Sequence, residues 1–339
     1  MRTAHKPRIV IYGTGQYGQY IARFAVQKGW PIVAAYNRAG PKVGQDIGRL
    51  AGLAKDIGVI VKDSETASYD NLDADIGVVT ATDRLQLNLP AYKRLMYAGL
   101  NVLCHGAESY FPYGNDAAIA AEIDAIAKTN KVTFTGSGIW DMSRIWAGIL
   151  VAGSCTDIRA MHHKSITDAQ RTGKQLMLVT GVGMSVEEYT AQLVKADGKI
   201  GGMYKTIPHH VLYALGYTVT KATERREPIV FDRPYYCQLL EQELAPGTVV
   251  GTRIIAEIET KQGVTADAHI ELRCFQEGEI EHMAWAVDGM PHSRVRVERD
   301  DSGHATAACL FNRIPDVIAA PPGIQEIYKL GPLRHSALS

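Results

Sequence analysis

Cysteine is scarce in this chain, and its positions do not suit cross-linking or metal binding. The 339 residues include five cysteines, at positions 104, 155, 237, 274 and 309, and no two of them form a CxxC pair. Disulfide frameworks and zinc sites normally use cysteines in even numbers or at paired spacings. The adjacent His162 and His163 also lack a set of acidic or thiol side chains at ligand spacing. The sequence therefore predicts free thiols and no metal site.

Net charge and long apolar runs are absent as well. The 36 basic and 36 acidic residues cancel, so no overall field attracts the protein to nucleic acid or to anionic lipid. No apolar run reaches the roughly 18 residues that span a bilayer. The first residues, "MRTAHKPRIV", lack the apolar core of a secretory signal. We expect no nucleic-acid or membrane partner and a cytoplasmic location.

What the first 138 residues do contain is an alternation of apolar β-branched runs with helical stretches. This pattern is typical of a parallel sheet with crossover helices. The expected strands are Arg8 to Tyr12, Ile32 to Asn37, Val59 to Lys62, Ile76 to Thr80, Asn101 to His105 and Val132 to Thr135. The expected helices are Tyr17 to Lys28, Leu85 to Ala98 and Asn115 to Thr129. The fold class is therefore α/β, with a doubly wound parallel sheet of the Rossmann type.

After Gly138 the pattern changes to that of an α+β domain with a mostly antiparallel sheet. Residues 251–297 carry successive strand-like runs that are separated by short turns. "SVEE" predicts a helix start, with Ser185 as N-cap and Glu188 as its capping-box partner. We predict a dinucleotide-binding domain at 1–138, completed by a C-terminal helix within 303–325 and interrupted at Pro315. Residues 139–302 would form the substrate-binding and dimerisation domain.

One glycine-rich turn carries the clearest chemical signal. "IVIYGTGQYG" places Gly13, Gly15 and Gly18 in G-x-G-x-x-G spacing after a strand and at the opening of a helix. The three glycines allow a tight turn, close approach of backbone to a pyrophosphate and close packing of helix on strand. The helix N-terminus offers amides to the phosphates. We predict dinucleotide contacts at the turn, which also includes Thr14, Gln16 and Tyr17.

The end of the second strand indicates which dinucleotide binds. An NAD-specific site normally has an acidic residue there, on the ribose hydroxyls. This chain has Asn37 followed by Arg38, so a 2′-phosphate would meet a cation. NADP is favoured, and acceptance of NAD stays open. Thr80, Ala81 and Thr82 close the fourth strand and are expected beside the cofactor.

The segment "CHGAESYF" places Glu108 just after the fifth strand, where such a sheet holds its ligand. Two resemblances fit this chain poorly. "MHHKSITDAQRTG" resembles the substrate signature of dihydrodipicolinate reductase, but the signature's proton-donating lysine falls on Ile166. Sugar and inositol dehydrogenases carry Glu-Lys-Pro after the fifth strand, whereas this chain reads "HGAES".

A longer match covers almost the whole chain. "YGTGQYG", "VGQDIGRLAGL" at 43–53, "HGAES", "TGSGIWD" at 135–141, "TGVGMSVEEY" at 180–189 and "NRIPDVIAAPPGI" at 312–324 occur in order. In these segments the sequence resembles the 2,4-diaminopentanoate dehydrogenase group and, more closely, its relatives called native amine dehydrogenases. The resemblance implies NAD(P)H-dependent reductive amination of small aldehydes or ketones with ammonia, and the reverse deamination. It also implies that Glu108 faces the nicotinamide.

A carboxylate suits that reaction, because it can orient ammonia, transfer protons and stabilise a cationic iminium. A lysine at position 108 would repel the cation. Two other functions stay open: an imine or enamine reductase like dihydrodipicolinate reductase, and a non-catalytic protein that senses NADP. The resemblance further implies a homodimer.

The family resemblance also suggests a substrate pocket and one more cofactor contact. Apolar residues that follow the sixth strand, and two methionines further along, are candidates for the pocket walls. They are Ile139, Trp140, Met142, Trp146, Met177 and Met184. Asn312 would reach the nicotinamide carboxamide if the last helix returns to the first domain. No cluster of Arg or Lys is directed at this pocket, which favours a carbonyl substrate without a carboxylate.

Overall fold

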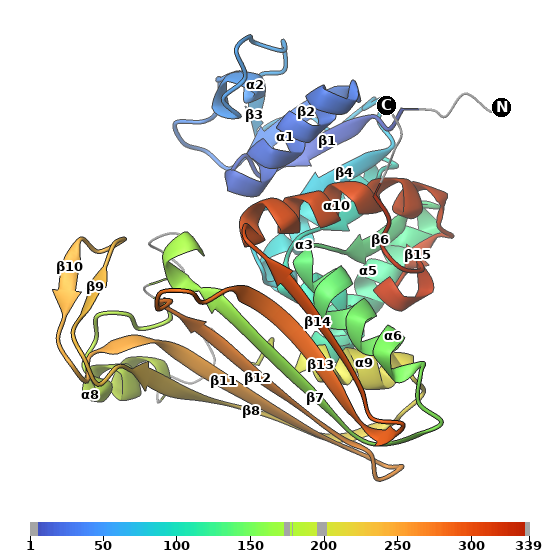
Figure 1. Ribbon diagram of the computed structural model, residues 1–339. Helices are drawn as coiled ribbons and strands as arrows, with labels where there is room; N and C mark the ends of the chain where they lie inside the picture. The colour runs from blue at the N-terminus through green and yellow to red at the C-terminus, as the bar shows by residue number, and fades with distance from the viewer. Residues whose placement is uncertain (1–5, 173–176, 178, 195–201, 336–339) are drawn as a thin grey trace. The chain divides into compact units, whose positions relative to one another are not determined.

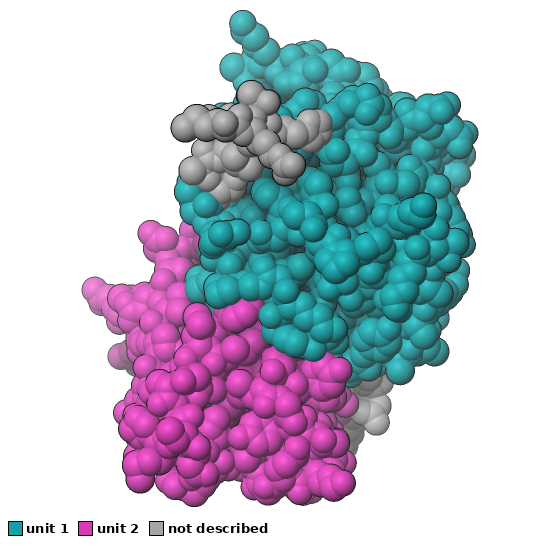
Figure 2. Space-filling view, turned by 90° about the vertical axis from the view of Figure 1, so that its right-hand side faces the viewer, with its two compact units in different colours: residues 1–142, 303–339 teal, residues 143–302 magenta. Residues whose placement is uncertain are grey.

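The structure is a computed structural model that describes residues 6–172, 177, 179–194 and 202–335. The chain divides into two compact units (Figures 1 and 2). Unit 1 consists of residues 1–142 and 303–339, and unit 2 consists of residues 143–302. Within the described ranges, no helix is both long enough and apolar enough to cross a lipid bilayer.

Unit 1 is built on a parallel sheet with the strand order β15, β6, β5, β4, β1, β2, β3. Its strands are β1 (Ile9–Tyr12), β2 (Ile32–Asn37), β3 (Val61–Asp63), β4 (Ile76–Val79), β5 (Asn101–Cys104), β6 (Thr133–Gly136) and β15 (Gly323–Ile324). β1 pairs with β2 on one side and with β4 on the other. The chain therefore winds outward in opposite directions from β1 and β4, and the predicted Rossmann fold is confirmed. Ligands bind beyond the carboxyl ends of the strands at such a reversal.

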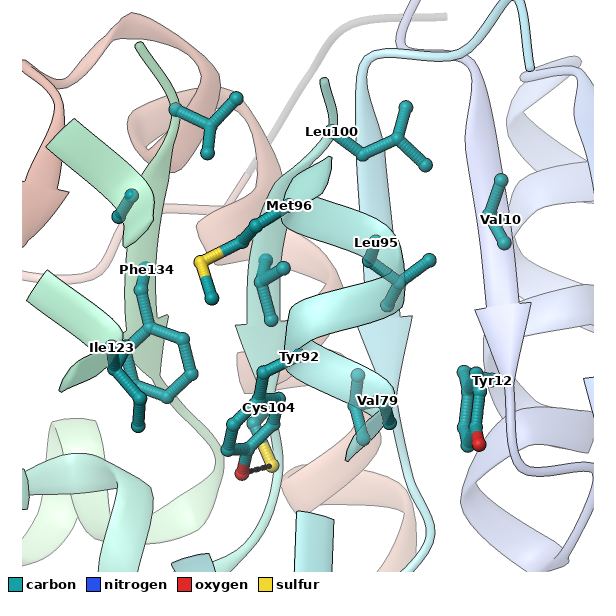
Figure 3. Packing of buried hydrophobic residues seen from close by; sticks show 14 of the residues in the cluster. Val10, Tyr12, Val79, Tyr92, Leu95, Met96, Leu100, Cys104, Ile123 and Phe134 are labelled. Atoms are coloured by element: carbon teal, nitrogen blue, oxygen red, sulfur yellow. Dashed lines mark hydrogen bonds between the residues drawn. The ribbon is translucent and has the colours of Figure 1, made fainter. Parts of the chain in front are cut away.

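Helices bury both faces of this sheet, which explains why its central strands β1 and β4 are buried at every position. Val10 packs with Leu95 of α3 (Leu85–Tyr97) in one cluster (Figure 3). Ile11 packs on the opposite face with Leu310 of α10 (Ser302–Ala319). Helix α1 (Gln16–Lys28) contributes to the second cluster and α5 (Ala117–Thr129) to the first. Each fully buried aliphatic side chain stabilises the fold by about 1.5–3 kcal/mol.

The last helix differs from the prediction. α10 runs without interruption through Pro315, so the predicted break at this residue is wrong. Proline removes one N–H from the helix and crowds the carbonyl four residues earlier, which often kinks a helix. The residues around it are fixed by other contacts: Arg313 is fully buried and donates hydrogen bonds to both carboxylate oxygens of Asp141, at 2.7 and 2.9 Å. This pair anchors α10 to the segment that follows β6 within unit 1.

Unit 2 contains a six-stranded mixed sheet with the order β14, β13, β7, β12, β11, β8. Its strands are β7 (Asp157–Asp168), β8 (Val219–Val230), β11 (Val249–Thr260), β12 (Thr265–Arg273), β13 (Glu281–Met290) and β14 (Ser293–Arg299). Only the pair of β7 with β12 is parallel. The predicted, mostly antiparallel sheet is thus confirmed.

Short elements complete unit 2. β9 (Tyr235–Cys237) and β10 (Gln242–Leu244) form a separate hairpin, and the helices are α6 (Ala147–Ala152), α8 (Val186–Tyr189) and α9 (Thr206–Ala214). The predicted capping box at Ser185 is present: its hydroxyl accepts from the Glu188 amide, and the Glu188 carboxylate accepts from the Ser185 amide.

Candidate active site at the carboxyl edge of the parallel sheet

The glycine-rich turn joins β1 to α1 and has open space in front of it. Gly13 has φ +99°, a left-handed conformation that only glycine adopts easily. A Cβ on Gly18 would overlap the carbonyl oxygen of Gly13, so glycine is needed for α1 to lie against the turn. A Cβ on Gly15, by contrast, meets no protein atom within 4 Å. The open side of the turn is where a pyrophosphate approaches.

Polar groups at this turn also fit a dinucleotide. A helix leaves its first amides without an acceptor inside the helix, and the N-cap residue of α1, Gly15, has no side chain to cap them. The hydroxyl of Thr14 is buried and has no hydrogen-bond partner among the described residues. Gln16 is exposed and Tyr17 is half-buried at the start of the helix. These residues could hold the phosphates of a bound dinucleotide.

Thr80 holds the turn in shape from the end of β4. Its hydroxyl donates to the carbonyl oxygen of Gly13 at 2.7 Å, and its amide donates to Tyr12 at 2.8 Å. The side chain is buried, so its hydrogen bond fixes the tight turn. Ala81, which is exposed, and Thr82, which is half-buried, follow at the same edge of the sheet.

Asn37 ends β2 and joins the phosphate turn to that strand. Its Oδ1 accepts from the amide of Thr14 at 3.1 Å, and its Nδ2 donates to the carbonyl of Arg38 at 2.9 Å. The neutral carboxamide therefore stands where an acidic residue would contact the ribose hydroxyls. The Arg38 side chain is exposed and forms no ion pair within the described part of the chain.

Glu108 lies on a short 3-10 helix, Ala107–Tyr110, directly after β5. Its Oε1 lies 3.0 Å from Nη1 of Arg84, and its Oε2 accepts from the amide of Leu85 at 2.8 Å. The carboxylate thus caps the N-terminus of α3, where a negative charge is favourable. The Glu108 side chain is 15% exposed, so it remains accessible to a small ligand.

The chain around Glu108 is tied to the end of β4. The amide of Glu108 donates to the carbonyl of Asp83 at 3.1 Å, and the amide of Ala107 donates to the Asp83 carboxylate at 3.1 Å. A Cβ on Gly106 would lie 2.5 Å from the carbonyl oxygen of Thr82. Glycine in "HGAES" therefore allows the two strand ends to approach closely.

Behind this edge, a buried polar group supports β5. The Tyr92 hydroxyl donates to Sγ of Cys104 at 3.0 Å (Figure 3), and Asn88 donates to the carbonyl of Thr82 at 2.7 Å. Burial raises the pKa of the Cys104 thiol, which therefore stays neutral. These contacts hold the ends of β4 and β5 in place.

His105 is a residue of this edge to which the sequence assigns no role. Its ring lies 4.8 Å from the ring of Tyr17, measured between centroids. Burial lowers the pKa of His105, and the nearby charge of Asp83 offsets part of this effect. The imidazole is therefore neutral near pH 7. Its buried Nδ1 has no hydrogen-bond partner among the residues that the structure describes. The only feature of the sequence that could have marked His105 as a site residue is its place directly before Gly106 in "HGAES".

The predicted pocket residues fall in both units. Ile139 and Trp140 lie in unit 1, where the ring of Trp140 is 5.6 Å from that of Tyr110. Met142 also belongs to unit 1 and is 36% exposed, whereas Trp146, Met177 and Met184 belong to unit 2.

Burial differs between the two predicted pocket methionines of unit 2, Met177 and Met184, and the predicted cofactor contact Asn312. Met177 is fully buried in a core cluster that also contains Cys237 and Cys274. Met184 and Asn312 are half-buried, the latter on α10 of unit 1. Among the described side chains, no three His, Cys, Asp or Glu residues gather as a metal ion would require.

The sheet order, the glycine-rich turn and the open space before Gly15 together define a dinucleotide-binding protein of the Rossmann class. Comparisons with known proteins identify its family. The family model described as the 2,4-diaminopentanoate dehydrogenase C-terminal domain matches residues 147–338. This chain therefore belongs to the 2,4-diaminopentanoate dehydrogenase family, and the resemblance seen in the sequence is confirmed.

Individual relatives agree with this assignment. The chain is 24% identical to the 2,4-diaminopentanoate dehydrogenase of Acetoanaerobium sticklandii, over 96% of this chain and 93% of that protein. It is 28% identical to the solved amine dehydrogenase from Mycobacterium smegmatis, with a TM-score of 0.88 over 99% of both chains. The myo-inositol 2-dehydrogenase from Lactobacillus plantarum, at 18% identity and a TM-score of 0.56 over 93% of this chain and 89% of that one, shares the fold.

Proposed function

We propose that the protein is an NAD(P)H-dependent amine dehydrogenase, an oxidoreductase that acts on CH–NH2 donors. It would aminate small aldehydes or ketones with ammonia and catalyse the reverse deamination. The names of two relatives that match over nearly the whole chain support an amine substrate. The observation that carries the proposal is the position of Glu108, at the carboxyl end of β5 and partly exposed.

The cofactor is proposed to be NADP, with NAD also accepted. At position 37 this chain has a neutral asparagine, where a carboxylate would repel a 2′-phosphate. Arg38 supplies an exposed cation beside Asn37. The turn at Gly13 to Gly18 would hold the pyrophosphate. Asn312 is proposed as a contact for the nicotinamide carboxamide. When bound, the reduced nicotinamide supplies the hydride.

Glu108 would perform the proton chemistry of amination. Ammonia must add to the carbonyl carbon, and the resulting carbinolamine must lose water to give an iminium. A carboxylate can orient the ammonia, accept a proton during addition and return one to the departing hydroxyl. Its negative charge then stabilises the iminium that accepts the hydride. Such a group typically contributes about 10²- to 10⁴-fold to the rate.

Two contacts fix the direction of the Glu108 carboxylate. The Leu85 amide binds Oε2, and the Arg84 guanidinium binds Oε1. Each carboxylate oxygen can accept more than one hydrogen bond, so both retain acceptor capacity for ammonia. We assign Arg84 as a positioning residue that acts through Glu108. The carbonyl oxygen and the carboxylate of Asp83, which accept from the amides of Glu108 and Ala107, place the 3-10 helix itself.

The apolar part of the substrate would meet Ile139 and Trp140, which follow β6 in unit 1. Met142, Trp146 and Met184 are further proposed contacts, and the buried Met177 would support the pocket from its core cluster. The homodimer is also part of the proposal, and its support is the family resemblance.

The test is the consumption of NADPH by the purified protein in the presence of ammonium and a panel of short ketones and aldehydes. Consumption that requires both ammonium and a carbonyl compound is the expected result. Consumption with cyclic imines alone would indicate the imine reductase instead. No consumption with any substrate, together with tight NADPH binding, would overturn the enzymatic assignment and indicate a sensor.

A further inference from the structure

Lys42 is a cation beside the phosphate turn that the sequence motifs do not mark. Its Nζ donates to the carbonyl oxygen of Thr14 at 3.0 Å, although 28 residues separate the two. The backbone of Thr14 is thus held at both ends, because its carbonyl oxygen accepts from Lys42 and its amide donates to Oδ1 of Asn37. Lys42 lies four residues after Arg38 in the loop that leaves β2. Both basic residues therefore belong to the region where an adenosine ribose binds.

Both cations have donors to spare. A lysine ammonium has three N–H donors, and one of them is used on Thr14. Neither Lys42 nor Arg38 forms an ion pair among the described residues. Two acidic residues at and just after the end of β3 have other contacts: Asp63 accepts from the amide of Glu65 at 2.9 Å, and Glu65 pairs with Arg94. No described carboxylate is therefore engaged with either cation.

The loop that carries Lys42 is held at a fixed place. The amide of Gly44 donates to the carbonyl oxygen of Val61 at 2.8 Å. The amide of Val61 donates in turn to the carbonyl oxygen of Gln45 at 2.9 Å. Just beyond, the buried carboxylate of Asp46 accepts from five backbone amides, those of residues 48, 49, 57, 58 and 59. A cation on such a loop does not need to be ordered when a ligand binds.

We infer that Lys42 and Arg38 together form the binding site for the 2′-phosphate of the adenosine ribose. A phosphate dianion is bound best by several charge-assisted hydrogen bonds, and two cations supply more of them than Arg38 alone. Asn37, which accepts from the Thr14 amide, adds no negative charge to this region. This inference rests on the proposed NADP preference and names a further residue that determines it.

The experiment measures binding of 2′,5′-ADP and of ADP by calorimetry, so it does not depend on turnover. The wild type is expected to bind 2′,5′-ADP more tightly than ADP. Lys42→Met should weaken 2′,5′-ADP binding by about tenfold or more, as the loss of a charged hydrogen bond does. ADP binding should change by less than about threefold. Lys42→Arg should retain most of the affinity, because it keeps the charge.

The matched control is Lys55→Met, which removes the same charge from an exposed position in the same unit. It should leave the affinities for both ligands unchanged. The inference is overturned if Lys42→Met weakens both ligands equally, which would assign Lys42 to the turn alone, or if it weakens neither. A wild type that does not prefer 2′,5′-ADP over ADP overturns it as well. Failure of the amination assay with retained discrimination would refute the proposed function and leave this inference standing.

Discussion

Two strand ends on the carboxyl edge of the parallel sheet carry charge in opposite ways. At the end of β2, Arg38 and Lys42 are cations that no described carboxylate neutralises. At the end of β5, Glu108 is a carboxylate that Arg84 already contacts. The difference follows from what each end would bind: a phosphate brings its own negative charge, whereas ammonia is small and neutral. The reacting end therefore needs a charged side chain that is held in place before the substrate arrives.

Apart from the effect at Glu108 itself, the largest expected effects come from two glycines of the turn that lies between these two strand ends. Gly15→Ala places a methyl group in open space, so protein stability should not change, but NADPH affinity should fall at least about tenfold. Gly18→Ala forces the turn to shift against Gly13 and should destabilise the protein by about 1–3 kcal/mol. Fluorescence titration with NADPH and thermal unfolding of both variants measure the two effects. Equal losses of stability in both variants would contradict this assignment.

A smaller effect is expected at the reacting end. Arg84→Ala should lower kcat for amination by about fivefold, because partly exposed ion pairs contribute up to about 1 kcal/mol. KM for NADPH should stay the same, and Arg84→Lys should restore part of the lost kcat. Steady-state kinetics with saturating ammonium separates the two parameters. If kcat is unchanged while the unfolding temperature falls, Arg84 serves the N-terminus of α3 and does not position Glu108.

The last effect concerns the loop that carries Lys42, bears on stability alone and depends on pH. Burial alone would raise the pKa of Asp46, but hydrogen bonds from the amides of Ile57, Gly48, Arg49 and Gly58 outweigh it and lower the pKa. The stabilisation by Asp46 is therefore complete above the unfolded pKa of about 4 and is lost as the pH falls through the lower folded value.

Asp46→Asn should accordingly cost about 1–2 kcal/mol at pH 7. The difference in the free energy of unfolding between this variant and the wild type should narrow below about pH 4. Urea denaturation at a series of pH values provides the measurement. A difference that grows on acidification would contradict the assigned hydrogen bonds.

Features fixed by neighbouring residues could be predicted from the sequence. The glycine spacing located the turn, and "SVEE" located the capping box at Ser185, because both depend on contacts within a few residues. The parallel strands were found because their apolar runs are buried on both faces. Pro315 was misjudged because the rest of α10 is anchored by Arg313, whose partner Asp141 is 172 residues away.

The candidate site was predictable only in part for the same reason. Glu108 was found through the fifth strand and the family resemblance. Its partner Arg84 and the cation Lys42 were missed, because their contacts join segments that are 24 and 28 residues apart. The parallel pairing of β7 with β12 was likewise not visible, because two separate apolar runs do not reveal which strands become neighbours.

The most direct measurement of the central claim is the single-turnover rate of amination by Glu108→Gln with NADPH prebound. Glutamine can still accept a hydrogen bond from the Leu85 amide, so the fold and the NADPH affinity should be retained. Glu122→Gln, at an exposed ion pair with Lys93, is the matched control and should be fully active. We predict that the Glu108→Gln rate falls by about 10²- to 10⁴-fold. If the Glu108→Gln rate is instead within about twofold of the wild-type rate, Glu108 caps α3 and transfers no proton.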